Sequence, residues 1–513
     1  MVSMITVAYH TLGCKVNQYE TEKIRESLEQ AGFATVPFGS RADAYVINTC
    51  TVTAVADSKS RAAVRKAMRA NPDAFVVVAG CYAELEPGRI AEIEGVDLVV
   101  ANDDKNVIPE RVIAHFAAFS PHPNPLPPGE RESRGGHSTF NIQHSTALNP
   151  QPSTLNVRPR LRTRAVVKVQ DGCDHFCSYC VVPYARSRRF SRPLEEVLAE
   201  LRSLAEFGYK EIVLTGIRLG SYRCGSTRLP ELIREAARID GIERIRLSSV
   251  EPWEIDDALL DAMDSPKVCR HLHIPLQSGD DGVLREMNRP YDSGQYTRII
   301  DRVRRRIDGI GITTDVMAGF PGETEEAFEN TCALIEKIGF SRTHVFRYSV
   351  RKRTKAASLP NQVDVQVKKR RAEKLIELGR IAMRRFASSL VGQTLEVLVQ
   401  SEINAGADRE SGKRSPGLQR PDYREHRGGG NPSKILSGLT DNYVVVSFPG
   451  DSSLKGEIVP VRIAGIGQDG GAVAECRVRS AELGVRADGK GGNRVGGLHI
   501  LQDREQADGK ARL

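Results

Sequence analysis

The chemistry of this 513-residue chain is indicated by one stretch, Asp171-Gly172-Cys173-Asp174-His175-Phe176-Cys177-Ser178-Tyr179-Cys180. Its cysteines follow a C-x3-C-x2-C spacing. Three thiolates on one short loop can hold three irons of a cubane iron–sulfur cluster. The fourth iron then lacks a protein ligand, and an open metal position is typical of a site that binds substrate. The spacing therefore predicts a reactive four-iron cluster on Cys173, Cys177 and Cys180, here called the loop cysteine set.

A structural zinc site is the alternative interpretation of the same segment. Its ligands would be Cys173, Cys177, Cys180 and His175. Structural zinc sites usually draw on two well-separated pairs of ligands. Four ligands so close together in sequence would be cramped, so the spacing favours the iron–sulfur cluster.

The loop resembles the signature of the radical S-adenosylmethionine enzymes. That family favours an aromatic residue just before the third cysteine, and Tyr179 fits. The resemblance implies that the open iron chelates the amino and carboxylate groups of S-adenosylmethionine. It also implies that an electron from the cluster cleaves the sulfonium and releases a 5′-deoxyadenosyl radical.

Three further cysteines, Cys14, Cys50 and Cys81, each follow an apolar run of strand character in a short turn. The runs are residues 5–9, 44–47 and 75–79, with helix-like stretches at 20–31 and 57–70 between them. Such alternation predicts a parallel sheet whose strands all end at one edge, where ligand sites of open α/β sheets form. Unrelated buried thiols are the alternative, but they would not explain three similar positions. We therefore expect this N-terminal cysteine set to converge on a second cluster with an open iron.

The turns around these cysteines resemble those of the methylthiotransferases, enzymes that replace an unactivated C–H bond with C–S–CH3. The matching segments are Thr11-Leu12-Gly13-Cys14-Lys15-Val16-Asn17-Gln18, Asn48-Thr49-Cys50-Thr51-Val52-Thr53 and Ala79-Gly80-Cys81. Two segments resemble the branch that acts on N6-threonylcarbamoyladenosine in tRNA: Gly13-Cys14-Lys15-Val16-Asn17 and Lys168-Val169-Gln170-Asp171-Gly172-Cys173.

The resemblance implies two 4Fe-4S clusters, S-adenosylmethionine as cofactor and tRNA as partner. One S-adenosylmethionine would methylate a sulfur carried at the N-terminal cysteine set, and the radical made at the loop set would activate C2 of the adenine at position 37. An electron donor such as flavodoxin or ferredoxin is also implied, while the sulfur source is not identified. Isopentenyladenosine in tRNA and an aspartate of a ribosomal protein are alternative substrates. A non-catalytic iron–sulfur protein that binds RNA or senses redox state is a further alternative, which the intact C-x3-C-x2-C spacing argues against.

The composition fits a protein of two to four domains in the cytoplasm. Hydrophobic residues make up 40% of the chain, and no apolar stretch approaches the ~20 residues of a membrane span. The N-terminus opens into a strand without a signal segment. Ten cysteines in a reducing compartment do not indicate disulfides, and Cys224, Cys269, Cys332 and Cys476 lack ligand spacing. The net charge of +8 is compatible with RNA but does not require it.

The fold expected is α/β, in three domains with two inserts. Residues 1–118 form the parallel α/β domain, and residues 119–158 read as a disordered linker, because residues 120–156 hold seven of the 26 prolines and show no apolar period. Residues 159–388 form the core that resembles a radical S-adenosylmethionine enzyme. Residues 389–465 form a small β-barrel with a polar insert at 402–434, and residues 466–513 are a tail.

The core predicts six strand–helix repeats, short of the eight of a full barrel. Strands are expected at 166–169, 211–216, 244–248, 271–274, 311–317 and 343–346, and helices at 194–206, 295–307 and 325–338. The family it resembles has such an incomplete (β/α)6 barrel, whose open side admits a large substrate. Loops after its strands are the natural place for the nucleotide. The expected cofactor-binding residues are Tyr179, Gly216, Ser249, Glu251, Gln277 and Asp315.

The C-terminal region reads as β, with strands at 394–399, 443–448 and 457–461. It resembles a TRAM domain, an OB-like RNA-binding barrel, in the segments Gly438-Leu439-Thr440-Asp441-Asn442-Tyr443 and Leu454-Lys455-Gly456-Glu457. A basic helix at 367–390 precedes it, either a solvated face or an RNA contact. Two residues depart from the family pattern, because Ser187 and Arg353 stand where glycine is usual.

Overall fold

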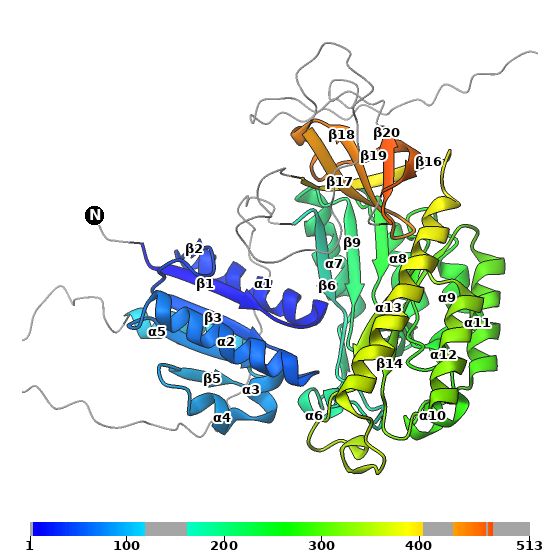
Figure 1. Cartoon of the computed structure of the whole chain (residues 1–513). Helices are drawn as coiled ribbons and strands as arrows, with labels where there is room; N and C mark the ends of the chain where they lie inside the picture. The colour runs from blue at the N-terminus through cyan, green and yellow to red at the C-terminus, as the bar shows by residue number, and fades with distance from the viewer. Residues whose placement is uncertain (1–3, 118–161, 404–433, 468–469, 476–513) are drawn as a thin grey trace, which may run out of the picture.

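The computed structural model describes residues 4–117, 162–403, 434–467 and 470–475. Three units follow one another along the chain: a blue α/β domain, a green open barrel and an orange closed barrel (Figure 1). The predicted linker, Cys476 and nearly all of the polar insert lie outside the described residues. Every helix in the described part is too short or too polar to cross a lipid bilayer.

The first unit is a five-stranded parallel sheet in the order β2-β1-β3-β4-β5. Its central strand β3 is buried along its whole length, because apolar clusters cover both faces of the sheet. The two edge strands were not predicted, because three residues each are too few to show a pattern. The strands are β1 (Thr6–Thr11), β2 (Ala34–Val36), β3 (Ala44–Thr49), β4 (Phe75–Gly80) and β5 (Leu98–Val100). The helices are α1 (Lys15–Gln30), α2 (Ala54–Ala70), α3 (Cys81–Leu85), α4 (Pro87–Ala91) and α5 (Ile108–Ala117).

The second unit, the half-barrel, has two parallel three-stranded sheets in the orders β12-β9-β6 and β13-β14-β15. An isolated bridge from Ser249 to His273 joins β12 to β13. Within the described residues no pairing joins β6 to β15, so the six strands leave one side open, as predicted. The strands are β6 (Arg164–Lys168), β9 (Glu211–Thr215), β12 (Arg244–Leu247), β13 (His271–His273), β14 (Gly311–Ala318) and β15 (Arg342–Arg347). The helices outside them are α7 (Leu194–Glu206), α8 (Leu229–Ala237), α9 (Asp257–Ala262), α10 (Asp281–Glu286), α11 (Ser293–Arg306) and α12 (Glu325–Ile338).

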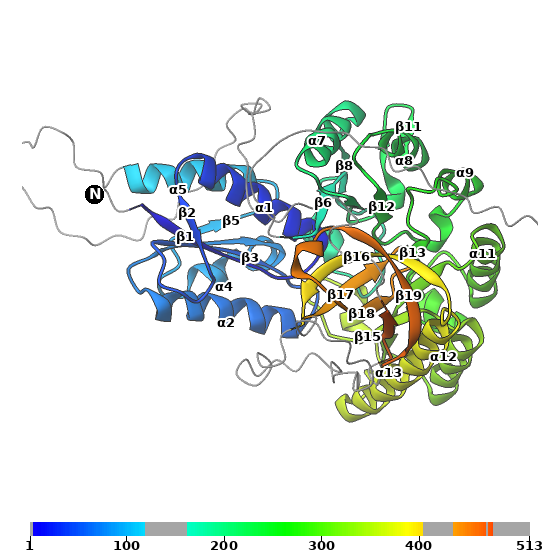
Figure 2. The ribbon, with the colours of Figure 1, turned by 90° about the horizontal axis from the view of Figure 1, so that it is seen from above.

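The α/β domain lies against the open side of the half-barrel (Figures 1 and 2). Helix α1 runs beside the edge strand β6, where Glu20 accepts a hydrogen bond from Lys168 at 2.9 Å. The start of α2 meets the loop after the other edge strand, β15, where Arg351 and Asp57 form an ion pair at 2.8 Å. The two domains therefore meet across the gap between β6 and β15.

The third unit is a closed five-stranded barrel in the order β16-β17-β18-β20-β19. Its strands are β16 (Thr394–Glu402), β17 (Lys434–Thr440), β18 (Val445–Gly450), β19 (Ile458–Ile466) and β20 (Ala472–Glu475). This confirms the predicted small barrel but corrects its end. Strand β20 falls in the predicted tail, so the barrel reaches at least Glu475 and not residue 465.

The closed barrel seals the end of the half-barrel where the strands begin. The buried Arg246 donates to the carbonyl oxygens of Thr440 and Asp441 at 3.0 and 2.8 Å. The Tyr443 ring stacks on His271 with centroids 4.2 Å apart. The carboxyl ends of the strands therefore remain for a ligand.

The predicted basic helix is α13 (Val365–Ser388), and the basic cluster near its start, residues 368–371, divides into two kinds of residue. Arg371 is buried and pairs with Glu323 at 2.8 Å, and the Lys368 ammonium lies 4.9 Å from the centre of the Tyr348 ring. Lys369 and Arg370 are exposed. Half of the basic cluster thus fastens the helix to the half-barrel.

Candidate functional site

The N-terminal cysteine set comes together at the carboxyl edge of the first sheet. Cys14 precedes α1, Cys50 follows β3 and Cys81 begins α3. Gly13 has a φ of 97°, and a Cβ there would lie 3.0 Å from the Cys50 sulfur, so only glycine allows this approach. Burial raises the pKa of Cys50 to about 11, and the nearby Cys81 and Cys14 thiols add to the rise.

Buried amides fasten these turns to one another. The Asn17 amide donates to the carbonyl oxygens of Leu12 and Thr49 at 2.8 and 3.0 Å. The Asn48 amide donates back to the Asn17 carbonyl at 3.0 Å. These bonds join the turn around Cys14 to the end of the strand before Cys50. They therefore fix the positions of the two cysteines relative to each other.

The loop cysteine set lies between β7 (Gln170–Asp171) and α6 (Val182–Ala185). The backbone N–H of His175 points at the Cys173 sulfur at 3.4 Å, and Arg289 Nη1 points at the Cys177 sulfur at 3.3 Å. Burial raises the pKa of Cys173 to about 11 and that of Cys180 to about 12, and the Cys177 thiol beside them adds to both rises.

Both sets carry features that suit the thiolate ligands of a four-iron cluster, which takes each thiolate on a different iron. Nε2 of His175 lies 2.9 Å from the Asn288 carbonyl oxygen. N–H donors point at sulfurs of both sets, since the Asn102 amide lies 3.6 Å from the Cys81 sulfur, and such donors tune iron–sulfur clusters. The zinc interpretation gains no support.

One turn, Ala185–Arg186, touches both cysteine sets. The Asn102 amide that points at Cys81 also donates to the Ala185 carbonyl at 2.7 Å, and the Cys173 N–H donates to the Arg186 carbonyl at 3.3 Å. Beside this turn, Cys81 and Leu85 pack with Val181 and Ala185 in a small apolar cluster. The two cysteine sets therefore lie on either side of a shared contact between the domains.

A buried ion-pair network continues from this turn. Arg186 donates to the Asn17 side chain at 2.7 Å and to Asp171 at 2.8 Å, and it also pairs with Glu20. Burial alone would raise the pKa of Glu20, but Lys105, Arg186 and Lys168 together hold it well below its usual range. The network keeps Glu20 ionised and ties α1 to the loop set.

Three of the predicted cofactor-binding residues meet at the carboxyl ends of β12, β13 and β14. Gln277 donates its backbone N–H to the Asp315 carbonyl at 2.8 Å, and Ser249 bridges to His273. The His273 ring nitrogen Nε2 lies 3.3 Å from the Asp315 carboxylate. Gln277 has a φ of 66°, a costly conformation for a residue with a side chain, and such strain is concentrated at functional sites.

The other three lie nearer the loop cysteine set. Glu251 pairs with Arg289. The Tyr179 ring packs against the apolar cluster that contains Phe320 and Tyr348. At Gly216 the Gln170 side chain fills the place of a side chain, since a Cβ there would lie 2.8 Å from its amide oxygen. Packing within the protein thus accounts for the residue types at Tyr179 and Gly216. Contact of either residue with a nucleotide stays a prediction.

Sequence reasoning missed Arg289. Its guanidinium lies 4.8 Å from the Trp253 ring centre and 5.1 Å from that of Tyr291, and it is buried beside Cys177. No spacing relates it to the cysteines, so only the folded structure identifies it. Arg186, by contrast, directly precedes Ser187, one of the two departures from the family pattern.

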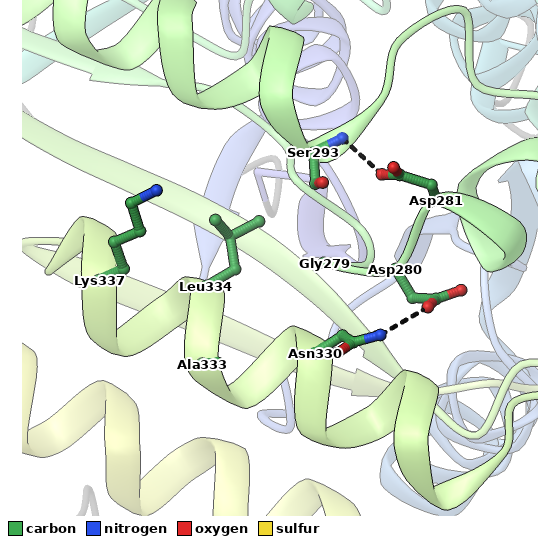
Figure 3. A pocket seen from close by; sticks show the side chains of 8 residues that line it. All are labelled: Gly279, Asp280, Asp281, Ser293, Asn330, Ala333, Leu334 and Lys337. Carbon is green, nitrogen blue, oxygen red and sulfur yellow. Dashed lines mark hydrogen bonds between the residues drawn. The ribbon is translucent and has the colours of Figure 1, made fainter.

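A separate pocket lies between α10, α11 and α12 (Figure 3). Both of its carboxylates are already engaged: Asp281 accepts from the Ser293 N–H at 2.8 Å, and Asp280 accepts from the Asn330 amide at 3.0 Å. None of its lining residues belongs to either cysteine set or to the predicted cofactor-binding residues.

Comparison with known proteins gives this arrangement a family. Residues 6–101 match the uncharacterized protein family UPF0004, and residues 167–335 match the radical SAM superfamily. The threonylcarbamoyladenosine tRNA methylthiotransferase MtaB of Bacillus subtilis is 37% identical over 466 residues, which cover 90% of this chain and 94% of that protein. The chain belongs to the radical S-adenosylmethionine methylthiotransferases.

Two further methylthiotransferases show how widely the similarity extends. The MtaB protein of Thermotoga maritima is 33% identical over 95% of this chain and 100% of its own length. The tRNA-2-methylthio-N(6)-dimethylallyladenosine synthase of Acetivibrio thermocellus is 32% identical over 88% of this chain and 87% of its own length. A methylthiotransferase of this family is an enzyme that uses S-adenosylmethionine and a 4Fe-4S cluster, which when bound supplies the electron that cleaves the sulfonium.

Proposed function

We propose that this methylthiotransferase acts on tRNA and converts N6-threonylcarbamoyladenosine at position 37 to its 2-methylthio form. The observation that carries the proposal is the pair of cysteine sets joined through the Ala185–Arg186 turn. Transfer of a thiomethyl group needs a radical site and a sulfur site that serve one substrate atom, and two sets on facing domains supply both. The names of the relatives from Bacillus and Thermotoga support the substrate.

Two 4Fe-4S clusters follow from this proposal. Cys173, Cys177 and Cys180 would hold the radical-generating cluster, and Cys14, Cys50 and Cys81 would hold the sulfur-carrying one. S-adenosylmethionine would lie against the loop set, with Tyr179, Gly216, Ser249, Glu251, Gln277 and Asp315 around it. The chain's own part is to fix both sets relative to one base and to keep water from them.

The remaining partners follow from the chemistry. Reduction of the radical cluster needs a one-electron donor such as flavodoxin or ferredoxin. The base must leave its stack to reach the half-barrel, and the closed C-terminal barrel, which we assign as a TRAM domain, would hold the RNA backbone. A tRNA substrate places the protein in the cytoplasm. The sulfur donor is not identified.

Nucleoside mass spectrometry tests the proposal. A bacterial strain that lacks its own methylthiotransferases, but whose tRNA contains both modified adenosines, is complemented with this chain. We expect the 2-methylthio form of N6-threonylcarbamoyladenosine to appear while isopentenyladenosine stays unchanged. Exclusive conversion of isopentenyladenosine would favour the activity named for the Acetivibrio relative. If both nucleosides remain unchanged, the result would contradict a tRNA substrate.

A further inference from the structure

The inner wall of the half-barrel is polar on the side formed by β13, β14 and β15. The Thr313 hydroxyl lies 3.0 Å from His271 Nε2 and 2.9 Å from His273 Nδ1. The His344 ring lies 5.7 Å from that of His273, and Asp315 stands beside His344 in the strand register. Closed barrels of this class fill their interior with branched aliphatic side chains, so this wall is suited to a polar ligand.

The wall also carries unused hydrogen-bonding capacity. His271 Nδ1 is buried without a partner among the described residues, and so is the hydroxyl of Ser248, which directly follows β12. Both residues are less than a tenth exposed. Buried polar atoms are rarely left unpaired in a finished structure, so a polar ligand or ordered water belongs in this interior.

Phe346 lies on the same strand as His344, two residues along, and therefore on the same face. Its side chain is 44% exposed, unusual for an aromatic ring on a barrel strand. An exposed ring among polar groups offers a base a stacking surface. The wall thus has the parts needed to receive an extruded nucleobase.

Lys15 lies on the other domain, at its contact with the half-barrel. It is the first residue of α1 and follows Cys14 directly. Gly13, two residues before it, packs against Cys50. Thr51, next to Cys50, accepts a hydrogen bond from Arg351 in the loop after β15. Burial is the main cause that lowers the pKa of His344 to about 4, and the Lys15 charge adds to it. The same charge acts on His271. The contact of these turns with the loop after β15, together with this effect of its charge, puts Lys15 at the open side of the half-barrel.

Lys15 has no direct polar partner among the described residues. None of the described residues forms a hydrogen bond or an ion pair with its ammonium group, and α1 has no acidic residue in its first turn. A cation at a helix N-terminus is opposed by the helix dipole. A lysine at this position therefore does not stabilise the helix. An anion from outside the protein could pair with its ammonium group.

We propose that Lys15 binds the free carboxylate of the threonylcarbamoyl group on the target base, while Phe346, His273 and His344 line the place of the ring. This rests on the proposed function and names its specificity determinant. In adenine both C2 and the carbon bearing N6 flank N1, so a group on N6 lies near the atom that receives sulfur. Lys15 is next in the chain to Cys14, the exposed cysteine of the sulfur-carrying set, and can reach that group. An isopentenyl group has no charge to satisfy Lys15.

The test compares Lys15→Met, Lys15→Arg and a matched control, Lys59→Met, an exposed lysine on α2. Binding is measured by fluorescence anisotropy with anticodon stem-loop RNAs that carry adenosine, N6-threonylcarbamoyladenosine or isopentenyladenosine at position 37. Thermal melting verifies that each variant is folded. The wild type should bind the threonylcarbamoyl RNA most tightly, and Lys15→Met should lose that preference, by about tenfold in Kd for one charge-assisted contact. Lys15→Arg and Lys59→Met should keep it.

Nucleoside mass spectrometry of complemented cells distinguishes a failure of the Lys15 proposal from a failure of the proposed function. If the wild type methylthiolates N6-threonylcarbamoyladenosine and Lys15→Met does so equally well with an unchanged Kd, the role of Lys15 is wrong while the proposed function stands. If the wild type neither prefers nor modifies that nucleoside, the proposed function itself fails. A parallel loss of binding to all three RNAs in Lys15→Met would make Lys15 a general phosphate contact and would overturn the carboxylate assignment.

Discussion

Arg186 of the half-barrel and Glu20 of helix α1 form a two-pronged ion pair between the domains. Nη1 donates to one carboxylate oxygen of Glu20 at 3.0 Å and Nη2 to the other at 2.9 Å. Both side chains are buried. Planar two-pronged pairing fixes orientation as well as distance, so this pair sets how the two cysteine sets face each other.

Replacing Arg186 with Met should destabilise the protein by about 3–5 kcal/mol, the usual effect of removing one partner of a buried pair. Lys105 and Lys168 remain near Glu20 and reduce the loss, which favours the lower end of that range. Urea unfolding followed by circular dichroism measures it. The control Arg238→Gln breaks an exposed pair with Glu235 and should change stability by at most about 1 kcal/mol. Equal effects of the two changes would contradict the role of the buried network.

Replacing Cys14, Cys50 and Cys81 with Ala should separate the reaction into two parts. The loop cysteine set stays intact on the other domain, so S-adenosylmethionine should still be cleaved to 5′-deoxyadenosine, while no methylthio nucleoside forms. Iron should fall from about eight to about four per chain if each set holds a four-iron cluster. The matched variant with Cys173, Cys177 and Cys180 replaced should lose the same iron and all cleavage. Methylthio product from the first variant would exclude the N-terminal set as sulfur carrier.

Local patterns in the sequence predicted much of this architecture. Long strands such as β3 and β14 and helices such as α7 and α12 carry their own periodicity, so α7 and α12 were placed with the bounds that the structure has. The short strands β2, β5 and β20 have too few residues for any pattern. Their existence depends on a neighbouring strand that offers hydrogen bonds, which is a property of the fold.

The site divides in the same way. Cysteine spacing and strand ends predicted the two thiol sets, because covalent geometry and parallel topology fix where those sulfurs go. Arg289 and Arg351 could not be found, since their partners Cys177 and Asp57 are far away in sequence. Tyr179 and Gly216 fitted a family pattern, yet packing against Phe320 and Gln170 is what the structure shows them doing.

Replacing Arg353 with Gly should stabilise the protein. Arg353 is exposed and has a φ of 72°, where residues with a Cβ are strained by about 1–2 kcal/mol. Glycine removes that strain but gains freedom in the unfolded chain, which leaves a net gain of roughly 0.5–1 kcal/mol. Thermal melting would show a higher Tm. The adjacent Lys352→Gly, at a residue without a positive φ, should lower it. A lower Tm for Arg353→Gly would mean that its side chain makes a contact worth more than the strain.

Acid should weaken the fold through His344. Its pKa is about 4 in the folded protein against 6.5 ordinarily, because burial outweighs the opposing charge of Asp315, and His273, Arg342 and Lys15 add to the lowering. Between these values the unfolded chain binds the proton and the folded chain does not. The stability present at pH 7 is therefore lost as pH falls from about 6.5 towards 4. His344→Gln should lose less stability than the wild type between pH 7 and pH 5, measured by urea unfolding at each pH. Parallel losses would assign the acid sensitivity to other groups.

Arg289 should set the reduction potential of the cluster that we assign to the loop cysteine set. Its Nη1 points at the Cys177 sulfur at 3.3 Å, and a hydrogen bond to a cluster sulfur favours the electron-rich reduced state. Arg289→Met should therefore shift the midpoint potential to more negative values in an EPR-monitored redox titration. Arg218→Met is the matched control, because Arg218 also lies near the loop and pairs with Asp174, yet none of its hydrogen bonds within the described residues goes to a sulfur. A larger shift for Arg289 than for Arg218 would assign the effect to the hydrogen bond. Equal shifts would mean that positive charge alone tunes the cluster, and no shift in Arg289→Met would show that this contact does not influence the potential.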